Sequence, residues 1–248
     1  MEEKGLRTFG LVGRSLNHSF SRNFFNDLFR DQDIHAQYLN FELSTIKEIR
    51  SVINSGASGL NVTIPYKESV IPFLDRLSDE ANAIGAVNCI QVINSKAIGH
   101  NTDAYGFHQS IKPFLTNRHE RALILGTGGA SKAIAYVLRK IGIDILFISR
   151  TPVRSNEFAY TDINEHMVKA CKLIVNCTPV GTYPNVTERV VFPYEFLTNE
   201  HLVVDLIYNP SETPFLKLAA EYGAETLNGE SMLRHQALRS WMIWNDQI

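Results

Sequence analysis

A glycine turn between an apolar strand and a helix constrains the fold of this chain most tightly. A strand pattern at Arg121–Leu125 runs through a GxGxxS turn into a helical pattern over residues 130–141. Gly126 permits the tight turn, Gly128 lets a pyrophosphate approach the backbone, and a small residue at Ser131 lets helix and strand pack closely. Free N–H groups at such a helix start bind phosphates. The context therefore favours a dinucleotide site over a mere tight turn.

The end of the next predicted strand, residues 144–148, indicates which dinucleotide is bound. NAD-binding units usually place an acidic residue there, where it bonds the ribose 2′-OH. This chain instead continues Ser149-Arg150-Thr151, without a carboxylate. A guanidinium suits a 2′-phosphate, so Arg150 favours NADP, and Arg154 could add a second positive charge. The alternative is that both are ordinary surface arginines.

Short apolar runs alternate with helical patterns along nearly the whole chain, which is typical of βα units and a mostly parallel sheet. The 248 residues suffice for one large domain or for two smaller ones, each with its own core. Strands are predicted at residues 8–13, 37–43, 59–64, 121–125, 144–148, 173–177 and 202–207. A hairpin is predicted over 86–93 and 97–102, with Asn94 and Ser95 in its turn. Helices are predicted at 21–29, from a capping box at Thr45 and Glu48 to residue 56, after Pro65, and at 104–115, 130–141, 213–222 and 230–244.

Composition excludes several classes of protein. A net charge of −2 implies no large basic surface, so it argues against non-specific nucleic-acid binding and leaves room only for a local basic pocket. No apolar run approaches the roughly 20 residues that span a bilayer, and the start MEEKGLRTFG does not resemble a signal peptide. We therefore expect a cytoplasmic protein without membrane or nucleic-acid partners. Cys89, Cys171 and Cys177 form no CxxC pair, so we expect neither a disulfide framework nor a metal site.

Polar residues stand at or inside predicted strands of the first half. Asn61 and Thr63 share one face of a strand, and Lys67 follows on the expected helix. Asn88 lies in an apolar run, where a buried amide must be hydrogen-bonded, and Asp103 follows a strand. Each residue alone has a simpler interpretation: structural bonding for Asn88, a surface position for Lys67 and a helix cap for Asp103. Pattern reasoning cannot bring these segments together in space.

A set of motifs in a fixed order makes the chain recognisable. These segments are GLVGRSLNHSFS at residues 10–21, NVTIPYK at 61–67, GAVN at 85–88, NTD at 101–103 with Gly106, GTGGA at 126–130, NCTP at 176–179 with Gly181, DLIYNP at 205–210, and Gly229 with Met232, Leu233 and Gln236. Together they span nearly the whole chain, and the sequence resembles the shikimate dehydrogenase family. The sequence departs from the family pattern at Arg22, where proline is usual, at Ser149, where asparagine is usual, and at Thr182, where methionine is common.

The resemblance implies a role for each matching residue. Lys67 and Asp103 match the catalytic pair, and Ser19 and Ser21 resemble the serines that bind the substrate carboxylate. The implied partners of the ring hydroxyls are Asn61, Thr63, Asn88, Asp103 and Gln236, with Tyr208 near the carboxylate. The expected cofactor-binding residues are Gly126, Thr127, Gly128, Gly129, Ala130, Ser149, Arg150, Thr151, Arg154, Thr178, Pro179, Ile207, Gly229 and Met232.

The resemblance also implies an α/β architecture with two domains. Residues 1–103 with 228–248 would form a mostly parallel α/β substrate-binding and catalytic domain, and residues 104–227 a Rossmann-type NADP-binding domain. The implied activity is reversible NADPH-dependent reduction of 3-dehydroshikimate to shikimate, by a monomer or homodimer. Two alternatives are a quinate/shikimate dehydrogenase that uses NAD and a non-catalytic ligand sensor. The missing acidic residue after Ile148 argues against the first, and retention of Lys67 and Asp103 argues against the second.

Overall fold

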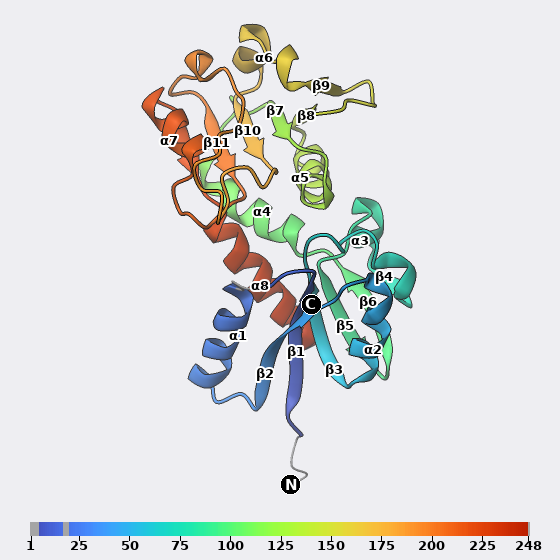
Figure 1. The fold of residues 1–248 in the computed structure, drawn as a ribbon. Coiled ribbons are helices and arrows are strands. Elements are labelled where there is room, and N and C mark those ends of the chain that lie inside the picture. The colour runs from blue at the N-terminus through green and yellow to red at the C-terminus, as the bar shows by residue number, and fades with distance from the viewer. Residues whose placement is uncertain (1–4, 17–19, 248) are drawn as a thin grey trace. The chain divides into compact units, whose positions relative to one another are not determined.

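The computed structural model describes residues 5–16 and 20–247 and separates them into two compact units (Figure 1). The first comprises Met1–Thr102 with Ala237–Ile248, and the second comprises Asp103–Gln236. Each unit is built on one six-stranded sheet. The α/β architecture expected from the alternating sequence pattern is therefore confirmed.

The division between the units differs from the one drawn from sequence. Contacts assign Asp103 and residues 228–236 to the second unit, so the boundary falls inside helix α8 (Glu230–Trp244). The reason is a close helix crossing at Gly106 in α4 (Asp103–Ile111). A Cβ atom at Gly106 would lie 2.6 Å from the Met232 carbonyl oxygen and 3.0 Å from Gln236 Cβ. The first turns of α8 therefore pack within the second unit.

The sheet of the first unit is mixed but mainly parallel, with strand order β2-β1-β3-β5-β6-β4. Strand β1 runs parallel to both β2 and β3, whereas β5 is antiparallel to β3 and β6. The predicted hairpin joins β5 to β6, and Asn94 and Ser95 adopt φ angles of 50° and 62°, as a two-residue turn with left-handed residues requires. The strands are Arg7–Gly13 (β1), Ala36–Glu42 (β2), Ala57–Val62 (β3), Arg76–Leu77 (β4), Cys89–Ile93 (β5) and Lys96–His100 (β6).

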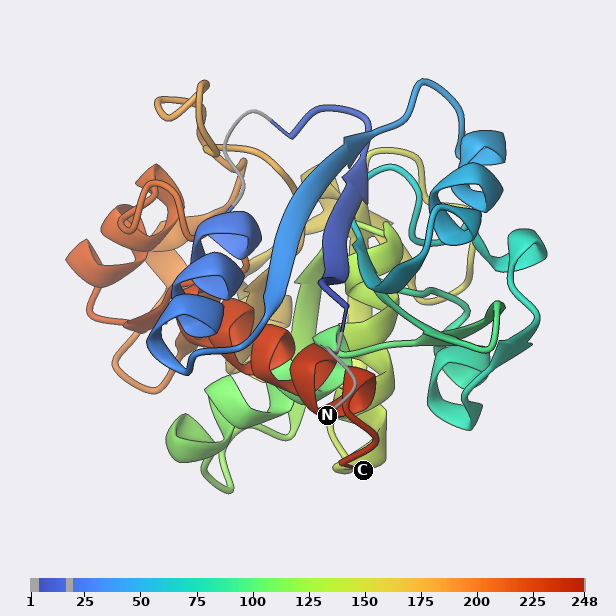
Figure 2. The same ribbon diagram turned by 90° about the horizontal axis from the view of Figure 1, so that it is seen from below.

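One face of this sheet is covered by α1 (Phe20–Asp31) and the end of α8, which Figure 2 shows beside β1 and β2. Trp244 is the centre of this aromatic core: it stacks on Phe9 at 4.8 Å, and its indole N–H donates to the Ile90 carbonyl at 3.0 Å. Gly59 lies under the indole, because a Cβ there would come within 2.4 Å of the ring. The end of α8 is thereby fixed to the first sheet.

The other face carries α2 (Ile49–Asn54) after a 3-10 turn at Ile46–Glu48, and α3 (Asp79–Ile84). Part of the predicted capping box is present, since the Thr45 N–H donates to Glu48 Oε1 at 2.9 Å. The helix predicted after Pro65 is wrong. Residues 65–70 form turns, followed by a 3-10 helix at Ile71–Phe73. The Lys67 carbonyl accepts the Val87 N–H at 2.7 Å, so it is not available to continue a helix.

The second sheet is entirely parallel, with strand order β12-β11-β10-β7-β8-β9. Counted from β7, this is the doubly wound 3-2-1-4-5-6 order, whose switch point lies between the first and fourth strands. The predicted Rossmann-type unit is therefore confirmed. Its strands are Arg121–Leu125 (β7), Asp144–Ser149 (β8), Glu157–Ala159 (β9), Leu173–Asn176 (β10), Leu202–Asp205 (β11) and Glu225–Leu227 (β12).

Helices cover both faces of the second sheet. Helix α5 (Gly129–Lys140) packs on α4, and a separate core joins the sheet to α6 (Glu165–Ala170) and α7 (Pro214–Glu221). Further 3-10 turns lie at Lys112–Phe114, Tyr160–Asp162 and Tyr194–Phe196. Only residues 150–156 connect β8 to β9, and this described stretch contains no helix. No helix in the described part of the chain is long and apolar enough to cross a membrane.

Candidate functional site

Backbone hydrogen bonds draw the polar segments of the first unit together at one end of its sheet. The Val62 N–H donates to the Asn88 carbonyl at 2.9 Å, and the Val87 N–H donates to the Lys67 carbonyl at 2.7 Å. Asn88 in turn donates its N–H to the His100 carbonyl at 3.1 Å. The ends of β3 and β6 and the start of β5 therefore meet. The structure unites Lys67 and Asn88 within one cluster, which pattern reasoning could not do.

Asn88 is buried and hydrogen-bonded to the chain. Its Nδ2 donates to Thr102 Oγ1 at 3.0 Å, and its Oδ1 accepts the Thr102 N–H at 2.6 Å. This is the bonding that a buried amide requires. It fixes the Asn88 side chain beside the end of β6, whatever that side chain binds.

Asn61 and Thr63, two residues apart on β3 and just beyond it, differ in their bonding. The Asn61 Oδ1 accepts the Tyr38 hydroxyl at 2.8 Å, while its Nδ2 donates to Ser240 Oγ at 2.9 Å and to the Asn88 carbonyl at 3.2 Å. Both hydrogens of the Asn61 amide thus have internal acceptors. The Thr63 hydroxyl has no hydrogen-bond partner among the described residues and is half-buried. Thr63 is therefore better placed than Asn61 to bind a ligand.

Ser21 joins the same network through Tyr38. Ser21 is buried on the first turn of α1, and its side chain is hydrogen-bonded to the Tyr38 hydroxyl. Burial raises the pKa of Tyr38 well above its usual value, Cys89 adds to the rise, and the bond to Ser21 opposes it. Tyr38 is therefore a neutral hydroxyl that links Ser21 to Asn61. The other predicted serine, Ser19, lies outside the described residues.

In the second unit, the glycine loop has the shape that a pyrophosphate needs. Gly126 has a φ of 101°, and a Cβ at Gly128 would meet nothing within 4 Å. Helix α5 begins at Gly129, so its first N–H groups lack intrahelical acceptors. The Ser131 hydroxyl donates to the Gly128 carbonyl at 2.6 Å, which secures the turn before the helix. Thr127 and Ala130 lie on the same loop and the first helical turn, and the site fits the expected phosphates.

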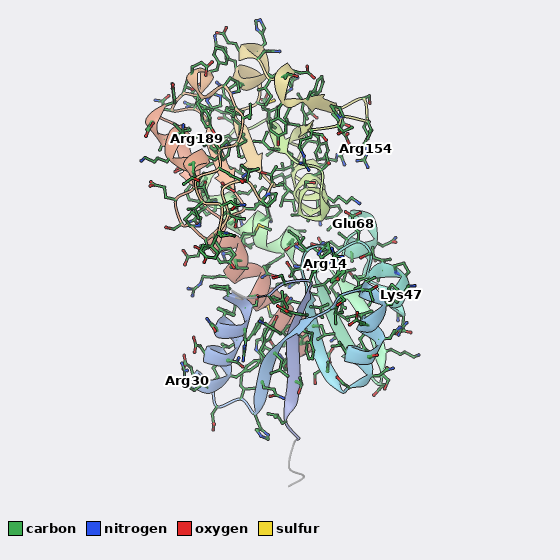
Figure 3. All side chains as sticks on the ribbon, viewed as in Figure 1. Arg14, Arg30, Lys47, Glu68, Arg154 and Arg189 are labelled. Atoms are coloured by element: carbon green, nitrogen blue, oxygen red, sulfur yellow. The ribbon has the colours of Figure 1, made fainter. Side chains whose placement is uncertain are left out.

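The loop after β8 carries the predicted arginines. Ser149 Oγ accepts the Thr151 N–H at 3.2 Å and shapes the turn that holds Arg150. Arg150 is exposed and forms no ion pair with the described residues. Arg154, labelled in Figure 3, lies further along this loop, with its Nε 3.5 Å from Glu157 Oε1. The loop therefore leaves Arg150 as the better partner for a 2′-phosphate.

The segments after β10 and β11 bring the remaining cofactor candidates into one unit. A Cβ at Gly126 would lie 3.1 Å from the Thr178 methyl, so the glycine loop and the Thr178–Pro179 turn are neighbours. The Gly229 N–H donates to the Ile207 carbonyl at 2.9 Å, and a Cβ at Gly229 would collide with the Leu206 carbonyl. Met232 follows one turn later on α8. Tyr208 lies at the surface of the loop after β11, with 36% of its area exposed.

Asp103 and Gln236 belong to the same unit as the glycine loop. Asp103 is buried in the first turn of α4, where the helix dipole stabilises a carboxylate. Gln236 of α8 lies beside Gly106, which follows Asp103 by one turn of α4. Lys67 belongs to the other unit, so the pairing of Lys67 with Asp103 stays a prediction. Within the described ranges, no group of three or more His, Cys, Asp or Glu side chains could hold a metal ion.

Several residues of these clusters were not predicted from sequence. Tyr38, Thr102 and Ser240 bond the predicted asparagines from distant parts of the chain, and no local pattern marks them. Asn176 and Asp205 carried a usable signal, because each is a polar residue that ends an apolar strand. Burial raises the pKa of Asp205 to about 6, although bonds from Thr213, the Ile207 N–H and Asn176 oppose the rise.

The fold and the glycine loop define a dinucleotide-binding α/β protein with a second, polar-lined unit. Comparison with known proteins makes the assignment narrower. Residues 11–90 match the model of the shikimate dehydrogenase substrate-binding domain. A shikimate dehydrogenase (NADP(+)) of Methanococcus maripaludis is 37% identical, over 98% of this chain and 93% of that protein. The chain belongs to the shikimate dehydrogenase family.

Two solved structures with this fold contain different dinucleotides. Shikimate 5-dehydrogenase of Thermus thermophilus, in complex with NADP(H) and shikimate, is 28% identical with a TM-score of 0.86, covering 97% of this chain and 94% of that one. Quinate dehydrogenase of Corynebacterium glutamicum, in complex with NAD, is 27% identical with a TM-score of 0.87, covering 98% and 94%. The same fold therefore serves two dinucleotides, and the local residues decide between them.

Proposed function

We propose that this chain is an NADP-dependent shikimate dehydrogenase, an oxidoreductase that reversibly reduces 3-dehydroshikimate to shikimate in chorismate and aromatic amino acid biosynthesis. The likeness to shikimate dehydrogenases over nearly the full length carries the proposal. The glycine loop and the exposed Arg150 support NADP as the cofactor. A cytoplasmic location and a monomeric or homodimeric state are part of the same proposal.

The chemistry needs a proton at the substrate oxygen. NADPH, when bound, supplies the hydride. Lys67 stabilises the negative charge that develops on the carbonyl oxygen and donates a proton to it. Asp103 orients the Lys67 ammonium and accepts the neighbouring ring hydroxyl. The backbone bond between Lys67 and Val87 supports this role, because it holds the start of the Lys67 side chain next to Asn88.

Substrate recognition rests on uncharged groups. Ser19 and Ser21 bind the carboxylate with Tyr208 nearby, while Thr63, Asn88 and Gln236 bind ring hydroxyls. Asn61 contributes mainly by supporting its neighbours, since both of its amide hydrogens are used internally. A site of this kind rejects analogues without the hydroxyls, because buried polar groups would lose their partners.

The second candidate is a quinate dehydrogenase that uses NAD, and the likeness to the Corynebacterium enzyme favours it. Initial rates with shikimate and with quinate, each with NADP and with NAD, separate the two. We expect the highest kcat/KM for shikimate with NADP. A preference for NAD would overturn the cofactor assignment, and no turnover of either acid would favour a ligand sensor.

The role of Lys67 is tested by Lys67→Ala. Loss of the proton donor should lower kcat by about 10²-fold or more, with a smaller change in the Kd of shikimate. Lys96→Ala is the matched control, because Lys96 is exposed at the start of β6, and this variant should keep full activity. If the two variants turn over equally fast, Lys67 does not carry the proton.

A further inference from the structure

Two buried polar residues at the ends of neighbouring strands have no part in the proposed chemistry. Asn176 ends β10 and Asp205 ends β11, and both side chains are fully buried. The two residues face each other in the parallel register of these strands. A buried carboxylate is costly unless hydrogen bonds compensate it, so its presence in the sheet calls for a reason.

Every polar atom of this pair is engaged. Asn176 Nδ2 donates to Asp205 Oδ1 at 3.0 Å, and the Ile207 N–H donates to the same oxygen at 3.1 Å. The Thr213 hydroxyl donates to Asp205 Oδ2 at 2.7 Å. On the other side, Asn176 Oδ1 accepts the Thr178 hydroxyl at 2.7 Å and the Thr178 N–H at 3.0 Å. A single chain of hydrogen bonds therefore runs from Thr178 to Thr213.

This chain of bonds ties together the segments at the carboxyl ends of the strands. The Thr178 methyl lies beside Gly126 of the glycine loop, 3.1 Å from where a Cβ would stand, and the Ile207 carbonyl accepts the Gly229 N–H. Thr213 is the N-cap of α7 and thereby fixes the far end of the loop after β11. Ligands of open α/β sheets bind at this edge, near the switch point. The pair thus lies behind the surface that a dinucleotide would contact.

We propose that Asn176 and Asp205 are positioning residues for the dinucleotide, which set the geometry of the Thr178 and Ile207 segments without touching the cofactor. This inference rests on the proposed function, since it assigns the same site its support. The ionised carboxylate is suited to the task because it only accepts hydrogen bonds, and the three groups around it are donors. An uncharged amide at 205 would present its own N–H groups to one of those donors.

The test is Asp205→Ala, with the Kd of NADPH measured by the change of its fluorescence on binding. We expect the Kd to rise about 10-fold or more, and KM for NADPH to rise further than kcat falls. Asp205→Asn keeps the shape and one acceptor oxygen, so it should fold and lose less affinity. The variants Asn176→Ala and Asn176→Ala/Asp205→Ala complete a double-mutant cycle, in which the two losses should be far from additive.

His201→Ala is the matched control, because His201 lies buried at the opposite end of β11 and bonds the Val168 carbonyl through Nε2 at 2.9 Å. It should weaken the fold without raising the Kd of NADPH. Equal Kd values for Asp205→Ala and wild type, or equal losses for Asp205→Ala and His201→Ala, would overturn the inference. Failure of wild type to bind NADPH would instead refute the proposed function.

Discussion

At the scale of single residues, Tyr38 has a buried hydroxyl beside two residues that are predicted to bind the substrate, Ser21 and Asn61. Its hydroxyl is hydrogen-bonded to Ser21 and donates to Asn61 at 2.8 Å. Tyr38→Phe removes only this oxygen. Because one such bond contributes about 0.5–1.5 kcal/mol, we expect KM for shikimate to rise roughly 2- to 10-fold. KM for NADPH should stay unchanged, and steady-state kinetics with each substrate varied in turn measure both.

Tyr66→Phe is the control for this prediction. It also removes a buried hydroxyl of the first unit, one that donates to the Leu43 carbonyl. If both variants raise KM for shikimate equally, the effect comes from general loosening of the unit and not from Ser21.

At the scale of elements, the short link between β8 and β9 separates the roles of the two arginines. Glu157 is buried, accepts the Val153 N–H at 2.8 Å and pairs with Arg154. Arg154 is thus already balanced by a carboxylate, whereas Arg150 is not. Because hydrogen bonds to charged groups contribute about 1.5–3 kcal/mol, Arg150→Ala should lower kcat/KM for NADPH by roughly 10- to 100-fold. Arg154→Ala should lower it much less.

Rates with NADH give the internal control, since NADH lacks the 2′-phosphate. Arg150→Ala should leave them nearly unchanged. Equal losses with the two cofactors would show that Arg150 supports the fold of the loop and does not select NADP.

At the scale of the whole molecule, two matching turns couple stability to pH. The Thr116 N–H donates to His119 Nδ1, and the Thr198 N–H donates to His201 Nδ1, both at 3.0 Å. Each imidazole must be neutral to accept this bond. Burial lowers the pKa of both histidines, although Glu225 near His119 and the Val168 carbonyl near His201 act in the opposite direction.

The sign of the pH effect follows from these shifts. In the unfolded chain the imidazoles titrate at about pH 6.5, above their pKa values in the folded state. On acidification the unfolded state therefore takes up protons first. The free energy of unfolding should therefore fall between pH 7.5 and 6. Asp205 has the opposite effect on the free energy of unfolding, at lower pH. Its pKa of about 6 in the folded state exceeds the unfolded value of 3.8, so on acidification the folded state takes up this proton first. Urea unfolding midpoints at the two pH values measure the change.

Variants without the titrating groups test this assignment. His119→Asn and His201→Asn keep a side-chain acceptor but no imidazole. Together they should reduce the pH dependence of the midpoint, even if they lower stability at pH 7.5. Burial also lowers the pKa of His100, which should leave a smaller slope of the same sign. A slope as steep as that of the wild type would assign the effect to other groups.

The sequence by itself determined the features that depend on a few neighbouring residues. The glycine loop needs a left-handed residue at Gly126 and an open backbone at Gly128, and both are readable locally. The same holds for the turn at Asn94 and for the absence of an acidic residue beside Arg150. The spacing of apolar residues elsewhere predicted the α/β architecture, because burial of one face of a strand or helix imposes this spacing on the sequence.

Only the tertiary structure decided where distant segments compete for the same atoms. A helix was predicted to include Lys67, but the Lys67 carbonyl accepts the N–H of Val87, which lies on another segment. The boundary between the units falls inside α8, whose first turns lie close to Gly106 of α4. Asn61 and Asp205 likewise bond residues that are distant in the chain, Ser240 and Asn176 respectively. Such bonds depend on which backbone groups and side chains the fold brings within reach, and no local pattern encodes that.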